Sequence, residues 1–99
     1  MMRKERLADG SIRAETEIIN RLGLHARAAA RFVETAARFT ADVTVSNGDE
    51  SVSGKSILGL MMLAAAEGTT LVLHATGPDA EEAVDALGAL IADKFHEGF

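Results

Sequence analysis

The hydrophobic pattern of this chain changes several times between the period of a strand and the period of a helix within 99 residues. Apolar and polar side chains alternate in residues 42–46 and 70–76, which is typical of strands with one buried face. Apolar residues recur every three or four positions in residues 26–38 and 79–95, which is typical of helices with one buried stripe. In so short a chain these faces can be buried only against one another. The pattern therefore predicts helices packed on a sheet.

The remaining segments complete the prediction of one small α+β domain. Two more strands and a short helix are predicted at residues 15–19, 50–53 and 57–65. The element order is β-α-β-β-α-β-α, so three helices can cover one face of a four-stranded sheet. Asp79 and Glu82 have the spacing of a capping box at the start of the last helix. We expect residues 1–14 to form a flexible N-terminal extension and residues 15–99 to form the domain.

The composition limits the classes of function open to the chain. It has no Cys, which excludes a disulfide framework and agrees with a reducing compartment. A net charge of -5 and the absence of Trp and Tyr argue against a nucleic-acid-binding protein. No apolar run is long enough to cross a membrane, and the first residues lack the apolar core of a signal peptide. We therefore expect a cytoplasmic protein that does not insert into a membrane. We also expect it to be a monomer.

Residues 20–32 lead from a turn into a helix and place a histidine at the junction. Gly23 permits a bend, and the alanines that follow favour a helix. His25 then lies in the first turn, where backbone N–H groups lack partners and the helix dipole is positive. A lone histidine at a helix start is more often a cap or a surface residue. With the guanidinium group of Arg27 two residues away, however, the motif predicts a site that stabilises a phosphoryl group on the imidazole.

A second candidate region begins at Ser56, whose side chain can cap the short helix that follows. That helix is apolar on all sides, and a small domain has difficulty in enclosing such a helix. One stripe of it can be buried, formed by Leu60, Leu63 and Ala64. Four large apolar side chains are then left over, those of Ile57, Leu58, Met61 and Met62. Such a surplus is either core or a surface for a partner protein, and methionines suit a surface that fits several partners.

The chain resembles the HPr family of the bacterial phosphotransferase system in two motifs, Gly23-Leu24-His25-Ala26-Arg27 and Lys55-Ser56-Ile57-Leu58-Gly59-Leu60. The resemblance covers residues 15–95. It implies an HPr-like open-faced β-sandwich, in which three helices cover one face of a four-stranded antiparallel sheet of order 1-4-2-3. It also implies that Nδ1 of His25 accepts a phosphoryl group derived from phosphoenolpyruvate from Enzyme I and passes it to an Enzyme IIA domain. Arg27 would balance the charge of the moving phosphate, and neither a cofactor nor a metal is implied.

The same resemblance implies a partner surface and a regulatory site. Enzyme I and Enzyme IIA are expected to contact Ala26, Ala30, Ile57, Leu58, Met61 and Met62. Ser56 matches a serine that an HPr kinase/phosphorylase modifies in some members, so it is a candidate for regulatory phosphorylation as well as a helix cap. Ala28 stands where many members of the sugar branch have Pro, and the alanine-rich sequence is more similar to the nitrogen-related NPr branch. The sequence does not decide whether the carrier acts in sugar uptake or in nitrogen-related signalling.

Two other classes of protein share some of these features. In a small acylphosphatase-like phosphohydrolase, an arginine at the helix start would bind phosphate and His25 would act as the base, but such an enzyme has no need of an apolar helix surface. A binding-only regulator of the same fold is the other alternative, but related regulators lack the phosphorylatable histidine. We therefore predict a phosphoryl carrier with a transient phosphohistidine rather than an enzyme.

Overall fold

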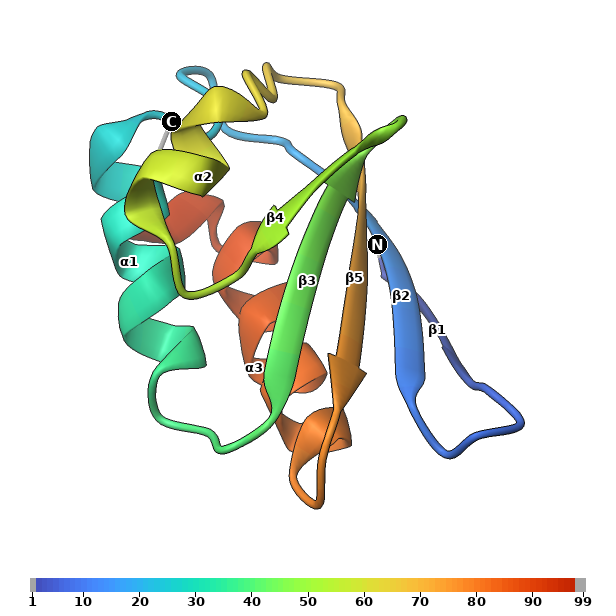
Figure 1. Ribbon diagram of the computed structural model, residues 1–99. Coiled ribbons are helices and arrows are strands. Elements are labelled where there is room, and N and C mark those ends of the chain that lie inside the picture. Colours follow the sequence, from blue (N-terminus) through green and yellow to red (C-terminus); the bar gives the residue numbers. More distant parts are fainter. Residues whose placement is uncertain (1, 98–99) are drawn as a thin grey trace.

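The computed structural model describes residues 2–97, which form one antiparallel sheet with helices packed on one of its faces (Figure 1). The strands within these residues are β1 (Arg3–Arg6), β2 (Ile12–Glu17), β3 (Asp42–Asn47), β4 (Glu50–Ser53) and β5 (Thr70–Thr76). The helices are α1 (Ala26–Ala36), α2 (Ile57–Met62) and α3 (Ala80–Ala92), followed by the short 3-10 turn η1 (Lys94–His96). The predicted α+β sandwich is therefore confirmed.

The four predicted strands keep their predicted order within the sheet, which reads β1-β2-β5-β3-β4. β2, β5, β3 and β4 correspond to the predicted strands 1, 4, 2 and 3, and each neighbouring pair is antiparallel. Buried residues of β2 lie opposite buried residues of β5, as Ala14 does opposite Leu73. Phe32 of α1 and Leu87 of α3 are also fully buried, so the core lies between the sheet and the helices.

The N-terminal segment is the main correction to the predicted fold. Residues 1–14 are predicted to be a flexible extension, and all but the first of them are described. β1 pairs with β2 and adds a fifth strand at the edge of the sheet. β2 begins at Ile12 instead of residue 15, so the predicted domain boundary falls inside a strand. All four residues of β1 are exposed, and therefore no alternation of apolar and polar residues marks this strand in the sequence.

Charged contacts attach β1 to α3. Lys4 Nζ lies 2.9 Å from a carboxylate oxygen of Glu81 and 2.6 Å from one of Asp85. Arg6 Nη2 lies 2.9 Å from the other carboxylate oxygen of Glu81. Hydrogen bonds to Asp85 and Glu81 raise the pKa of Lys4 above its ordinary value. These contacts join opposite ends of the sequence, so a local pattern cannot reveal them.

Helix capping agrees with the prediction at one helix and differs at another. Ser56 caps α2 as predicted, because its Oγ accepts a hydrogen bond from the backbone N–H of Gly59 at 2.9 Å. Asp79 makes no side-chain cap of α3. Its carboxylate instead accepts backbone hydrogen bonds from Thr40 at 2.9 Å and Ala41 at 2.8 Å. These bonds hold the pKa of Asp79 below its usual value, and the bond from Thr40 contributes most. The predicted capping box is therefore wrong, because the loop after α1 uses the carboxylate.

The helices end earlier than predicted. α1 ends at Ala36 and α2 at Met62, each before the last residue of its predicted range. Ala64, predicted to belong to the buried stripe of the short helix, has a φ of +50° and is exposed. α3 ends at Ala92, although Phe95 still reaches the core from the turn that follows. Within residues 2–97, no helix has both the length and the apolar character that spanning a membrane requires.

Candidate functional site

His25 is the N-cap of α1. Its backbone is extended (φ -77°, ψ -178°), and its Nδ1 accepts a hydrogen bond from the backbone N–H of Arg27 at 3.3 Å. The first backbone bond of the helix joins the N–H of Ala29 to the carbonyl of His25 at 2.8 Å, so the N–H groups of residues 26–28 precede it. The His25 side chain is 28% exposed. Nδ1 therefore faces the positive end of the helix dipole at a place that a partner can reach.

The turn before His25 depends on Gly23. This residue has a φ of +66°, and a Cβ built on it would lie 2.4 Å from the carbonyl oxygen of Ala65. The same carbonyl accepts a hydrogen bond from the backbone N–H of Leu24 at 2.9 Å. The side-chain amide of Asn20 donates to the carbonyl of Gly23 at 2.8 Å. The segment after α2 and the buried Asn20 thus fix the backbone that presents the histidine.

The other ring nitrogen of His25 contacts the C-terminal segment. Its Nε2 is hydrogen-bonded to the carboxylate of Glu97, whose side chain is only 3% exposed. The Nδ2 group of Asn20 donates to Glu97 Oε1 at 3.0 Å. No sequence pattern pointed to Glu97, because it lies beyond the predicted last helix. The burial of the Glu97 carboxylate depends on the folded chain and cannot be read from the residues beside it.

Two arginines of α1 have different surroundings. Arg27 is exposed in the first turn, where its backbone N–H bonds the His25 ring. Arg31, one turn later, donates from Nη1 to the carbonyl of Phe95 and so supports the C-terminal turn. Arg27 is therefore the better placed of the two to balance the charge of an anion at His25.

The predicted surplus of apolar side chains on α2 lies on the surface. The exposed fractions are 43% for Ile57, 69% for Leu58, 41% for Met61 and 67% for Met62, which together we call the apolar patch. Leu60 and Leu63 are buried, as predicted. α2 packs beside α1 (Figure 1). Ala26 and Ala30 of α1 are exposed. The patch is therefore surface rather than core.

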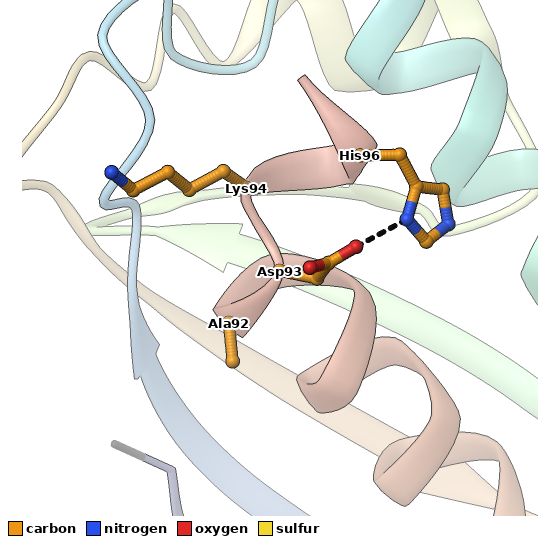
Figure 2. A pocket seen from close by; sticks show the side chains of 4 residues that line it. All are labelled: Ala92, Asp93, Lys94 and His96. Atoms are coloured by element: carbon orange, nitrogen blue, oxygen red, sulfur yellow. Dashed lines mark hydrogen bonds and ion pairs between the residues drawn. The ribbon is translucent and has the colours of Figure 1, made fainter. Parts of the chain in front are cut away.

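A hollow lies at the end of α3, lined by Ala92, Asp93, Lys94 and His96 (Figure 2). The ring of His96 bonds the Asp93 carboxylate, while Lys94 points away from both. His25 does not line this hollow. Among residues 2–97, no group of three or more His, Cys, Asp or Glu side chains could hold a metal ion. The hollow matters here because its walls form the turn that leads to Glu97.

Comparison with known proteins decides the family. The sequence model described as "PTS HPr component phosphorylation site" matches residues 12–93. The chain belongs to the PTS HPr family. The phosphocarrier protein HPr of Cupriavidus necator is 51% identical over 87 residues, which cover 88% of this chain and 98% of that protein. The predicted resemblance is therefore confirmed.

Two further HPr-family relatives bear on the branch and the fold. The phosphocarrier protein NPr of Shewanella violacea is 43% identical over 83 residues, covering 84% of this chain and 91% of that protein. The crystal structure of HPr-C-His from Thermoanaerobacter tengcongensis has a TM-score of 0.84 at 44% identity, covering 88% of this chain and 98% of that chain. Since relatives are named both HPr and NPr, family membership alone does not choose between the branches.

The predicted site residues of this HPr-family protein do not all come together. Leu24, beside His25, bonds Ala65 after the end of α2, whereas Lys55, beside Ser56, bonds the carbonyl of Phe39 beyond the other end of α1. His25 and Arg27 lie at the N-terminus of α1, and Ser56 lies at the N-terminus of α2. As a member of this family, the protein is a phosphocarrier of the phosphotransferase system, a carrier rather than a catalyst. Glu97 is the residue that the structure adds to the predicted set.

Proposed function

We propose that the protein accepts a phosphoryl group from Enzyme I on Nδ1 of His25 and passes it to an Enzyme IIA domain. The N-cap geometry carries this proposal: Nδ1 lies 3.3 Å from the backbone nitrogen of Arg27, and the ring is partly exposed. Oxygens of a phosphoryl group on Nδ1 would lie near the N–H groups of residues 26–28 and the exposed Arg27 guanidinium. Membership of the HPr family supports the same role.

The chemistry of this proposal is an in-line displacement. The lone pair of Nδ1 forms a bond to phosphorus while the bond from phosphorus to the donor breaks, and the electron pair of that bond stays with the donor. The charge on the phosphoryl oxygens meets donors that are already oriented by the helix start, which lowers the barrier. Transfer to Enzyme IIA repeats the displacement with a new acceptor. The protein therefore leaves each cycle unchanged.

A carrier passes its phosphate on rather than releasing it. With phosphoenolpyruvate and Enzyme I, we expect one acid-labile, base-stable phosphoryl group per chain. Adding a purified Enzyme IIA domain should move the radiolabel to that domain, as followed on gels. Sustained release of inorganic phosphate without an acceptor would contradict the carrier function and favour the hydrolase. Comparing Enzyme IIA domains of the sugar and nitrogen-related branches assigns the branch.

We further propose that Enzyme I and Enzyme IIA dock on the apolar patch together with Ala26 and Ala30, and that Ser56 is a regulatory phosphorylation site. Ser56 is the N-cap of α2 and directly precedes Ile57 of the patch. A phosphate there is compatible with the fold because the helix dipole favours negative charge at this end. It would nevertheless weaken docking of an acidic partner through like-charge repulsion and desolvation.

Met61→Glu and Ser56→Asp should each weaken Enzyme I binding by at least roughly tenfold while leaving the unfolding midpoint nearly unchanged. Met61 is 41% exposed, so a charge there costs little in the free protein but is desolvated in the complex. Affinity is measured by titration calorimetry and stability by thermal denaturation. Ser56→Ala is the control: it should bind normally and lose about 1 kcal/mol of stability with its cap. A large fall in the midpoint of Met61→Glu would show that Met61 belongs to the core.

A further inference from the structure

Glu97 is held in place by two side chains of the turn that presents His25. Its carboxylate bonds Nε2 of His25 and accepts a hydrogen bond from the Asn20 amide at 3.0 Å. Asn20 is fully buried, and the same amide nitrogen donates to the carbonyl of Gly23 at 2.8 Å. A flipped amide would turn its oxygen toward two acceptors, so Asn20 must act as a donor here. The Glu97 carboxylate is thus part of the framework of the site.

The two contacts of the His25 ring select the same tautomer. An ionised carboxylate can only accept, so the Nε2 atom that faces Glu97 must carry the proton. The backbone N–H of Arg27 can only donate, so the Nδ1 atom that faces it must present its lone pair. The neutral ring is therefore protonated on Nε2 and unprotonated on Nδ1. This leaves Nδ1, the nitrogen that points at the helix N-terminus, with an unprotonated lone pair.

We infer that Glu97 is a positioning residue that holds His25 in this tautomer and so directs the phosphoryl group to Nδ1. The inference rests on the proposed function and specifies how the site is prepared for it. When Nδ1 bonds phosphorus, the proton stays on Nε2 and the ring becomes a cation, while the electron pair of the breaking bond stays with the Enzyme I donor. The buried Glu97 carboxylate then lies against this cation and stabilises it.

The backbone that delivers Glu97 is strained. Lys94, Phe95 and His96 have φ values of +55°, +55° and +65°, a left-handed conformation that residues with a side chain rarely adopt. The turn is stabilised by the complete burial of Phe95, by the bond from Arg31 to the Phe95 carbonyl and by the pair of His96 with Asp93 (Figure 2). Such strain persists only where surrounding contacts maintain it, and here it aims a carboxylate at the site.

The test combines a tautomer measurement with a rate measurement on the full chain. Long-range ¹H–¹⁵N spectra report which ring nitrogen of neutral His25 carries the proton, with His74 as an internal reference. Wild type should show the Nε2–H form. Glu97→Ala should mix the two tautomers and slow phosphorylation by phosphoenolpyruvate and Enzyme I about tenfold. Glu97→Gln keeps an acceptor oxygen, so it should retain the tautomer and lose less rate.

Glu82→Ala, which removes an exposed carboxylate from α3, is the matched control and should change neither reading. An unchanged tautomer in Glu97→Ala would overturn the inference. A mixed tautomer with an unchanged rate would also overturn it, because positioning would then have no consequence for transfer. Failure of the proposed function is a separate result: wild type would show the Nε2–H form but take up no phosphoryl group.

Discussion

Replacing His25 with Asn should reduce phosphorylation by phosphoenolpyruvate and Enzyme I to background. The amide nitrogen of Asn is not a nucleophile, so the bond to phosphorus cannot form. Asn is chosen because it is among the preferred N-cap residues, whereas Ala would remove the cap and cost about 1 kcal/mol. His25 caps α1 through its own ring, so the cap must be kept if the loss is to be ascribed to chemistry. Intact-mass spectrometry measures the incorporation, and circular dichroism checks the fold.

The other two histidines provide controls for this experiment. His74 Nε2 bonds the Ser11 hydroxyl at 3.0 Å, away from the start of α1. His96 is exposed and pairs with Asp93. His74→Asn and His96→Asn keep the His25 acceptor and should therefore still take up one phosphoryl group per chain. If His25→Asn is still labelled with one group per chain, the acceptor lies elsewhere and the proposed function is wrong.

Features that depend on neighbouring residues could be predicted from the sequence. β4 and β5 have the predicted bounds because the sequence patterns that indicate a strand act over a few positions. The places of His25 and Ser56 at two helix starts follow from the residues next to them. For the apolar patch, counting the faces that a short helix can bury shows a surplus but leaves core and surface open, and the folded structure places the patch on the surface.

Features that depend on distant segments could not be predicted in this way. β1 carries only exposed charged residues, and its partners on α3 come near the other end of the chain. Asp79 has the spacing of a cap, but two backbone N–H groups of the loop after α1 compete for its carboxylate. Glu97 lies 72 residues from His25 and reaches it through a left-handed turn that the residue types in the turn do not predict. Its place beside the ring is a property of the folded chain.

Gly23→Ala should lower the free energy of unfolding by about 3 kcal/mol or more. The residue has a φ of +66°, which alone costs a residue with a side chain roughly 1–3 kcal/mol. The added Cβ would also lie 2.4 Å from the carbonyl oxygen of Ala65, so the backbone must move. For a domain of this size the unfolding midpoint should fall by more than about 12 °C. Thermal denaturation followed by circular dichroism measures the change.

Gly48→Ala separates the two causes of this effect. Gly48 has nearly the same φ, +63°, but nothing lies within 4 Å of a Cβ built there. It should therefore lose only the conformational part, roughly 1–3 kcal/mol, without the added cost of a close contact, and keep normal phosphorylation. At temperatures below its unfolding midpoint, folded Gly23→Ala should be phosphorylated more slowly than wild type. The reason is that the displaced Ala65 carbonyl also bonds Leu24, the residue before His25. Equal midpoints for the two variants would show that the close approach to Ala65 does not determine how the histidine is presented.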